Sequence, residues 1–354
     1  MSYLEDHYNA YDEDGRLLSR HGQVEYRTTM KYIKACLAEH ENVKILEVGA
    51  GTGRYSVTLA KEGYDVTAVE LLPHNLEILR AKLDGSEPIV TMQGNALDLS
   101  GLTDNYFDVT MLLGPMYHLY TREDKIKALS EAVRVTKPGG HILVAYCMNE
   151  PVIVQYVFGK NNLQKVTDLH MLTKDWHCIS EPKDLFEMVR TEEIAGLDAE
   201  LPVERIKLVA TDGATNYMAE TVDAMDDETF ERWMDYHFLA CERQDLIGAS
   251  HHTLDIMKKK ADSLSRVKAM ETIFDTALKL INEGTVNSKE LLAYQPQIKR
   301  LSDYYESPEW KEDFEADESG KLPSDLKRGV LSEDGIYNLL EQNKEILEEI
   351  KQND

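Results

Sequence analysis

Basic residues are scarce in this chain: 39 Lys and Arg stand against 64 Asp and Glu in 354 residues, which gives a net charge of −25. Affinity for nucleic acid comes largely from basic side chains that replace counterions on phosphates, so this charge argues against RNA or DNA as a partner. An anionic membrane surface is disfavoured for the same reason. The composition therefore predicts a protein that binds neither nucleic acid nor membrane.

Cysteine is also rare, and no two cysteines are close enough to form a CxxC pair. The four are Cys36, Cys147, Cys178 and Cys241. Their scatter excludes zinc ribbons and dithiol redox motifs, and it is typical of a reducing cytosol. The N-terminal segment lacks the basic and apolar regions of a secretory signal, and no run approaches the roughly 18 apolar residues of a membrane span. We expect a cytoplasmic protein.

Short apolar runs alternate with amphipathic segments through the first part of the chain. The runs predict strands at 43–48, 65–70, 88–93, 107–113 and 141–146, and the segments predict helices at 23–41, 54–62, 73–83 and 122–136. This alternation indicates a parallel sheet covered on both faces. With further strands at 206–210 and 252–257, we predict an α/β fold with a doubly wound sheet of seven strands.

After residue 260 the pattern becomes helical only. Three amphipathic stripes, at 267–280, 291–305 and 336–350, keep helical spacing and could pack on one another. We predict a domain boundary here. An α/β domain would occupy 1–260, with an N-terminal lid and helix over 1–40, and a small all-helical domain would occupy 261–354.

A glycine-rich loop follows the first predicted strand, in the sequence ILEVGAGTGRYS at 45–56. Alternate glycines allow a tight turn and let a ligand lie against the backbone. The dinucleotide fingerprint is GxGxxG. Here the pattern is GxGxG, and Glu47 stands two positions before the first glycine. An acid so close to the loop suits a ligand that carries positive charge better than it suits a pyrophosphate.

The second predicted strand ends in Glu70. A carboxylate at this place, roughly twenty residues beyond the glycine loop, can accept hydrogen bonds from both hydroxyls of a ribose. The ligand should therefore hold a nucleoside and a cationic part without phosphate. S-adenosylmethionine (SAM), with its ammonium and sulfonium groups, has both.

These residues resemble the class I SAM-dependent methyltransferases. The resemblance is carried by LEVGAGTGRYS (46–56), VTAVELL (66–72), GNALDL (94–99), FDVTMLLGPMYHL (107–119) and VRVTKPGGHILVA (133–145). It covers about residues 40–150 closely and 1–260 loosely. It implies a Rossmann-like sheet, SAM as the cofactor and S-adenosylhomocysteine (SAH) as its product.

The resemblance also implies a set of cofactor-binding residues. They are Glu47, Gly49, Ala50, Gly51, Gly53, Glu70, Leu71, Asn95, Ala96, Leu113 and Gly114. In such enzymes the glycine loop and the fourth strand's end hold the methionine part, and the acid after the second strand holds the ribose. The residues after the third strand face the adenine, where many members of the family carry Asp in place of Asn95.

Candidates for contact with the methyl acceptor follow the fourth predicted strand. Tyr117 and His118 lie where this fold places residues beside the transferred methyl group, and a histidine titrates near the pH that suits a general base. The alternative is a packed aromatic and a hydrogen-bonded core histidine.

The segment before the first long helix holds further candidates: Tyr8, Tyr11, Arg20 and His21. In similar enzymes this segment forms a lid, and the alternative is a surface arm. The segments 148–176 and 213–220 follow later strands and are candidates for the substrate wall.

No metal site is predicted. His237 and Cys241 share a helix face, but metal binding needs more ligands, and methyl transfer from a sulfonium needs no metal.

The C-terminal part, about 265–352, resembles a small, mainly helical bacterial family of unknown function. Within it, residues 306–318 hold seven acids and one base, with Trp310 and Phe314 four positions apart. One interpretation is a docking surface for a basic protein partner. The other is a solvated helix with its aromatic residues in the core.

The sequence therefore predicts a SAM-dependent methyltransferase that acts on a small molecule. One alternative is a protein or RNA methyltransferase whose partner is recruited by the C-terminal domain, and another is an idle protein that binds SAM or SAH. An aromatic-lined pocket favours the small acceptor, a basic cleft favours RNA, and an open cleft without polar groups favours the idle binder.

Overall fold

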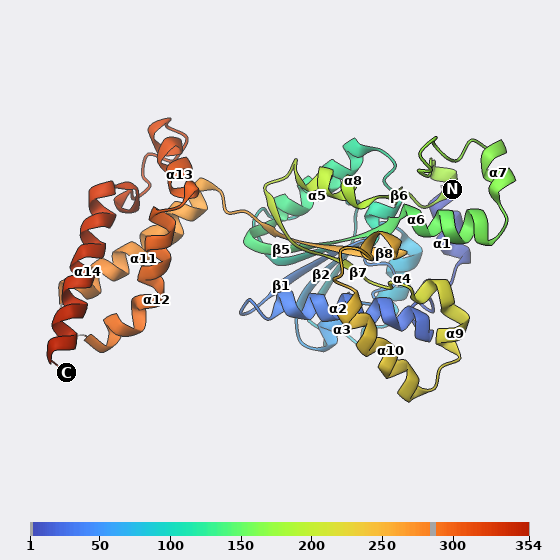
Figure 1. Cartoon of the computed structure of the whole chain (residues 1–354), viewed down its shortest axis with the longest axis horizontal. Coiled ribbons are helices and arrows are strands. Elements are labelled where there is room, and N and C mark those ends of the chain that lie inside the picture. Colours follow the sequence, from blue (N-terminus) through green and yellow to red (C-terminus); the bar gives the residue numbers. More distant parts are fainter. Residues whose placement is uncertain (1–2, 284–287, 354) are drawn as a thin grey trace. The chain divides into compact units, whose positions relative to one another are not determined.

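The computed structural model describes residues 3–283 and 288–353 and separates into two compact units, 1–260 and 261–354 (Figure 1). We call them the α/β unit and the helical unit. None of the helices in the described part of the chain combines the length and the apolar character that a membrane crossing requires.

The α/β unit is built around one mixed sheet. Its strands are β1 (Lys44–Val48), β2 (Asp65–Glu70), β3 (Ile89–Gln93), β4 (Phe107–Leu112), β5 (Thr136–Met148), β6 (Met188–Val189), β7 (Val203–Ala210) and β8 (His252–Lys259). The order is β3-β2-β1-β4-β5-β8-β7, with β6 paired to β5. The first five strands are mutually parallel, whereas β8 runs antiparallel to β5 and β7. The predicted fold class is confirmed, and the two-residue β6 is added because so short a strand shows no alternation.

Helices cover both faces of this sheet, as Figure 1 shows. On one face lie α2 (Arg20–Leu37), α3 (Ser56–Lys61), α4 (Pro73–Ala81) and, against α2, α10 (Asp227–Ala240); on the other lie α5 (Arg122–Val135) and α8 (Thr191–Asp198). Shorter helices are α1 (Tyr3–Ala10), α6 (Asn149–Pro151), α7 (Leu163–Asp168) and α9 (Ala219–Asp223), and a π-helical turn spans Val152–Gly159. Burial on both faces explains why the parallel strands are apolar runs without alternation.

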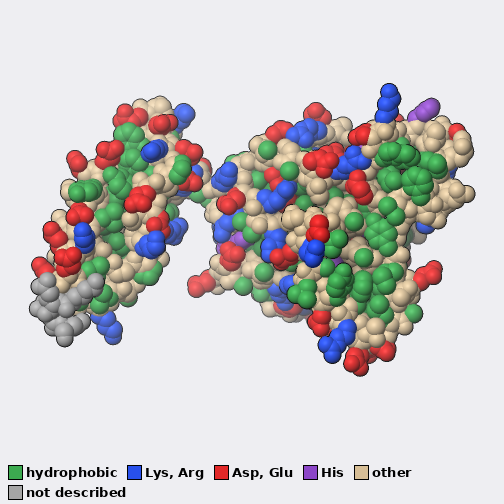
Figure 2. Space-filling view, in the orientation of Figure 1, with side chains coloured by type: hydrophobic (Ala, Val, Ile, Leu, Met, Phe, Trp, Pro, Cys, Tyr) green, Lys and Arg blue, Asp and Glu red, His purple; other side chains and the backbone are tan. Residues whose placement is uncertain are grey.

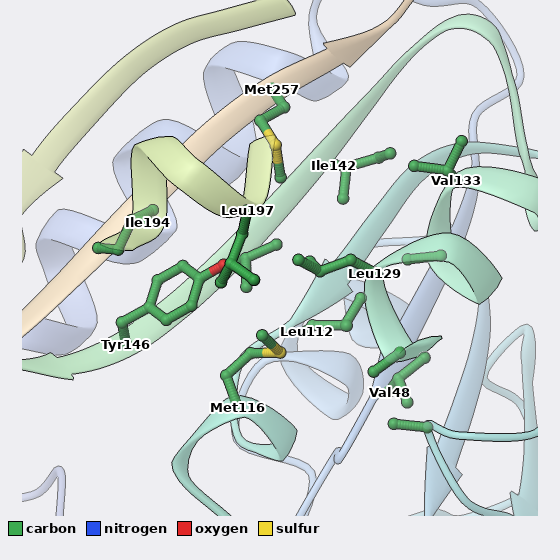
Figure 3. Close-up of a cluster of buried hydrophobic side chains, with 14 of the residues drawn as sticks. Val48, Leu112, Met116, Leu129, Val133, Ile142, Tyr146, Ile194, Leu197 and Met257 are labelled. Atoms are coloured by element: carbon green, nitrogen blue, oxygen red, sulfur yellow. The ribbon is translucent and has the colours of Figure 1, made fainter. Parts of the chain in front are cut away.

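The core beneath α5 and α8 fixes the ends of the central strands (Figure 3). Leu197 of α8 lies beside Tyr146, near the end of β5, and Leu129 of α5 is buried in the same cluster. Met116, just beyond β4, is buried in the same cluster. Close packing here holds the segment after β4, which carries candidate site residues, against the sheet.

One predicted boundary is wrong. The sequence predicts a helix over 122–136 and a strand over 141–146, but β5 already begins at Thr136. The pairing of β4 with β5 is irregular between Phe107 and Val109, and Gly139 has a φ of +77°. A β-bulge that contains glycine has the same local sequence as a turn, so the sequence alone does not distinguish the two.

The helical unit contains α11 (Ser263–Glu283), α12 (Ser288–Tyr305), α13 (Pro308–Glu318) and α14 (Glu333–Asn353). The three predicted stripes lie on α11, α12 and α14 and share one core. Trp310 of α13 is buried in that core, donates its indole N–H to the Val330 carbonyl at 3.0 Å, and stacks on Phe314. These aromatic residues therefore belong to the unit's own core, as the second interpretation of the acidic segment expects.

Candidate active site

A cavity of about 660 Å³ opens at the edge of the sheet where the parallel strands end. The strand order reverses at β1, which lies between β2 and β4, and ligands of open α/β sheets bind in the crevice at such a reversal. Because β8 runs the opposite way, its first residue, His252, reaches the same edge, in register with Cys147 of β5. Both residues line the cavity.

The glycine loop forms one wall of the cavity. Gly51 has a φ of +55°, and a Cβ built there would meet no atom within 4 Å, so the loop leaves room for a ligand against its backbone. Gly53, at φ +84°, is different, because its Cβ would lie 2.6 Å from Leu79 Cγ and 2.7 Å from Val57 Cγ2. Gly53 does not line the cavity, which corrects its predicted role: it lets the loop pack on α4.

Two buried carboxylates line the cavity beside this loop. Glu47 is 1% exposed and accepts a hydrogen bond from the Ser56 backbone N–H at 2.9 Å. Burial raises the pKa of Glu47 to about 8.

Glu70, 5% exposed, accepts from the backbone N–H of Gly51 at 2.7 Å and of Leu72 at 2.8 Å. Burial raises the pKa of Glu70 as well, and these N–H groups partly oppose the shift. A ligand with positive charge and hydroxyl groups would stabilise both carboxylates.

The other predicted cofactor residues also line the cavity: Gly49, Ala50, Leu71, Asn95, Ala96, Leu113 and Gly114. Asn95 is exposed, and its side-chain oxygen accepts a hydrogen bond from the Leu97 N–H at 2.9 Å. Its amide NH₂ therefore remains as a donor, the opposite polarity to an aspartate at this place.

Aromatic and histidine side chains line the cavity beside the ends of β4 and β5 and the start of β8. We call this group the aromatic end of the cavity: Tyr8, Tyr11, Tyr117, His118, Phe186 and His252. His118 Nδ1 lies 2.7 Å from the Leu185 carbonyl, which can only accept, so Nδ1 carries the hydrogen. Nε2 then accepts from the Tyr8 hydroxyl at 3.1 Å. Burial lowers the pKa of His118, which keeps the imidazole neutral.

Two of the four N-terminal candidates lie elsewhere. Tyr8 and Tyr11 line the cavity, but Arg20 and His21 do not. Arg20 pairs with Asp227 at 2.7 Å, and His21 pairs with Asp223 at 2.7 Å. Both residues belong to the first turn of α2 and hold it to α9 and α10, so in this structure they lie outside the cavity that Tyr8 and Tyr11 line.

The predicted substrate wall is also corrected. Neither 148–176 nor 213–220 contributes to the cavity, whereas Pro182 and Phe186 do. The Asn149 side chain donates to the Trp176 carbonyl at 3.0 Å and accepts from the Cys178 N–H at 2.8 Å. These hydrogen bonds join the two ends of segment 148–176, which lies outside the cavity.

Sequence patterns missed a group of charged residues at the aromatic end. Arg16 binds both oxygens of Glu25, at 2.8 and 3.0 Å, and His252 lies 2.7 Å from Asp212. No spacing connects these residues along the chain. His252 was expected only to open a strand, because the antiparallel direction of β8 was not visible in the sequence.

Comparison with known proteins identifies part of the chain. Residues 46–144 match the family described as "Methyltransferase domain". This match supports an enzyme with SAM as its cofactor, as the sequence predicts. Residues 267–352, beyond the methyltransferase domain, match "Domain of unknown function (DUF4298)", so both predicted resemblances are confirmed.

Individual relatives are similar mainly around the methyltransferase domain. The demethylmenaquinone methyltransferase of Clavibacter sepedonicus is 32% identical over 41% of this chain and 56% of that protein. A ubiquinone biosynthesis O-methyltransferase of Alkalilimnicola ehrlichii is 25% identical over 54% and 77%. A solved SAM-dependent methyltransferase of Methanosarcina mazei is 16% identical, with a TM-score of 0.44 over 65% of this chain and 98% of that one. The chain spans about half the length of the first curated relatives it matches.

Proposed function

We propose that the α/β unit, 1–260, is a SAM-dependent methyltransferase that acts on a small molecule bound at the aromatic end of the cavity. The observation that carries this proposal is the composition of one cavity. Its wall joins a glycine loop and two buried carboxylates on one side to aromatic and histidine side chains on the other.

The cofactor fits the first side. Gly51 leaves space against the loop, Glu70 has lone pairs for ribose hydroxyls, and Glu47 offers a carboxylate to the ammonium group. Bound SAM supplies an electrophilic methyl group on a positively charged sulfur. The chain's contribution is to hold acceptor and cofactor in line at near-contact distance, which supplies most of the acceleration in such displacements.

The aromatic end suits a small acceptor that loses a proton. His118 is neutral, and Tyr8 donates to its Nε2, so the pair can take a proton from an acceptor hydroxyl or amine. Tyr117 is buried beside them and lines the cavity. On the face seen in Figure 2, Lys and Arg side chains lie among Asp and Glu side chains rather than in a separate patch. This distribution favours the small molecule over RNA.

Transfer of labelled methyl groups tests the proposal. The full chain would be incubated with methyl-labelled SAM and a cell extract, which is then divided into small molecules, protein and RNA. We expect the label in the small-molecule fraction. Label in protein or RNA would support the alternative acceptors, and no label in any fraction would support the idle binder.

SAM binding should release protons at neutral pH. Below about pH 8 the Glu47 carboxyl of the free protein is mostly protonated. A cationic ligand favours the ionised form, so its binding expels the proton. Calorimetry in two buffers of different ionisation enthalpy would measure this release as a buffer-dependent heat, and the Glu47→Gln variant should lose it. Equal heats in both buffers would contradict the assignment.

Replacing His118 by Ala should leave SAM affinity within about threefold and lower turnover at least about tenfold, because a general base typically contributes about 100-fold or more. Tyr117→Phe tests the other predicted acceptor contact. If the Tyr117 hydroxyl contacts the acceptor, this variant should also lower turnover and leave SAM affinity within about threefold. Label incorporation into the small-molecule fraction measures turnover.

Tyr120→Phe is the matched control, because the Tyr120 hydroxyl donates to the same Leu185 carbonyl at 2.8 Å as His118 does. A fall in melting temperature that parallels the lost activity would instead assign His118 to the core.

The fragment 1–260 should fold and bind SAM without the helical unit. Within residues 3–283 and 288–353, all eight strands and every residue that lines the cavity precede residue 261. Circular dichroism and calorimetry of the fragment would check this, with the full chain as the reference. An insoluble fragment, or a soluble one that does not bind SAM, would show that the helical unit completes the fold.

A further inference from the structure

His252 reaches the cavity through the direction of β8. Since β8 is antiparallel to β5 and β7, its first residue lies at the edge where those strands end. There Cys147 of β5 lies beside it, and Asp212 follows β7. Glu70 ends β2, on the far side of β1. The imidazole of His252 therefore belongs to the aromatic end, away from Glu70, which would hold the ribose.

One edge of this imidazole is fixed by buried acids. Nδ1 lies 2.7 Å from Asp212 Oδ2 and 3.5 Å from Glu25 Oε2. Asp212 is itself held, because its Oδ1 accepts from the Ser250 hydroxyl at 2.5 Å and the His251 N–H at 2.9 Å. Asn216 donates to Oδ2 at 2.7 Å. A carboxylate can only accept, so Nδ1 of His252 carries a hydrogen.

The charge on the ring follows from its neighbours. Burial alone disfavours protonation, but the Glu25 and Asp212 carboxylates outweigh it and hold the pKa of His252 well above its ordinary value. In the imidazolium both nitrogens are donors. No residue in the described part of the chain accepts a hydrogen bond from Nε2, and the ring lines the cavity.

The cluster of Glu25, Asp212 and His252 is better explained as a hydrogen-bonded group than as a metal site. Glu25, Asp212 and His252 bring possible ligand atoms within 4.8 Å of one another. However, the Arg16 guanidinium occupies both Glu25 oxygens, at 2.8 and 3.0 Å. Two cationic side chains thus already neutralise the two carboxylates, and a divalent cation would have to displace one of them.

We propose that His252 presents its Nε2–H to the methyl acceptor, and that the acceptor carries an oxyanion, either a carboxylate or a deprotonated hydroxyl, on an apolar body. This inference rests on the function proposed above. The Nε2–H donor of His252 faces a cavity lined by Tyr117, Phe186 and other aromatic residues. It therefore favours an apolar ligand that carries a hydrogen-bond acceptor. Hydrogen bonds between charged groups are the strong ones, and a desolvated site strengthens them further.

Binding of small probes to the SAH-loaded full chain tests the inference. Benzoate and 4-nitrophenolate supply the two oxyanions, and benzamide and nitrobenzene are their uncharged counterparts. At a pH where both acids are ionised, at least one oxyanion should bind with about millimolar affinity, the range expected for a ligand of this size. It should bind at least about tenfold more tightly than its counterpart, which corresponds to one charge-assisted hydrogen bond.

His252→Gln should abolish this preference while SAH still binds. His251→Gln is the matched control, since the neighbouring His251 does not line the cavity and bonds Gln155 at 2.7 Å. If the His252 variant fails to fold, NMR of the wild-type ring supplies the answer. Its Nε2 signal should shift with the oxyanion and not with the uncharged probe.

Preference for benzoate would assign a carboxylate, and preference for 4-nitrophenolate a deprotonated hydroxyl; both support the inference. SAH binding with no preference for either oxyanion would overturn it and leave the proposed function intact. Failure to bind SAH would overturn the proposed function, and the inference with it.

Discussion

Gly53→Ala should lower the free energy of unfolding by about 2–4 kcal/mol, the combined cost of a positive φ for a residue with a side chain and of overpacking in a core. The new methyl group would lie 2.6 Å from Leu79 Cγ and 2.7 Å from Val57 Cγ2, and both neighbours are buried. Chemical denaturation measures the loss. A stability within experimental error of wild type would contradict the packing role given to Gly53.

Gly51→Ala is the matched partner of this variant. It shares the positive φ, at a cost of about 1–2 kcal/mol, but its methyl group meets no protein atom within 4 Å. It would instead fill space in the cavity, so we expect a folded protein whose SAM affinity is at least about tenfold lower, as for other misfits in a binding site. Unchanged SAM affinity would show that the ligand does not lie against this loop.

Glu70→Ala should weaken SAM binding by about 1–3 kcal/mol, the cost of leaving buried hydroxyl groups without partners. The substitution also removes the acceptor of the Gly51 and Leu72 N–H groups, so the loop would lose its own support. Glu70→Gln separates the two effects, because an amide oxygen can still accept from one of these groups. Calorimetric titration with SAM measures both variants.

Asp65→Ala controls for any general effect on the strand. Asp65 lies at the other end of β2, is exposed, and pairs with Lys44 at 2.7 Å. SAM affinity should be unchanged in this variant. An equal loss in both variants, or no loss in Glu70→Ala, would remove Glu70 from the binding site.

The parts of the site that follow the sheet could be predicted from the sequence. Parallel strands end at one edge of the sheet, so residues at or just beyond their ends lie at one cavity. Glu70 at the end of β2 and Tyr117 after β4 are examples. The glycine spacing located the turn. It did not reveal that Gly51 borders the cavity while Gly53 borders Leu79, because both need the same backbone conformation.

The parts that depend on tertiary pairing could not be predicted. Arg20 and His21 are polar residues of the kind found in a substrate lid. Their position is set by the ion pairs that they form with residues of α9 and α10. The sequence predicts that a strand begins at His252, but it does not show whether that strand runs parallel or antiparallel to β5. Only the antiparallel pairing brings His252 beside Cys147. The acid that holds its ring, Asp212, is some forty residues away and is placed by β7. Local sequence carries no signal for such contacts.

Calorimetric titration of the full chain with SAM, SAH and NAD tests the central claim most directly. The GxGxG loop, the carboxylate of Glu47 and the hydroxyl-binding carboxylate of Glu70 predict that SAM and SAH bind and that NAD does not. Tight binding of NAD, or no binding of SAM and SAH, would contradict it.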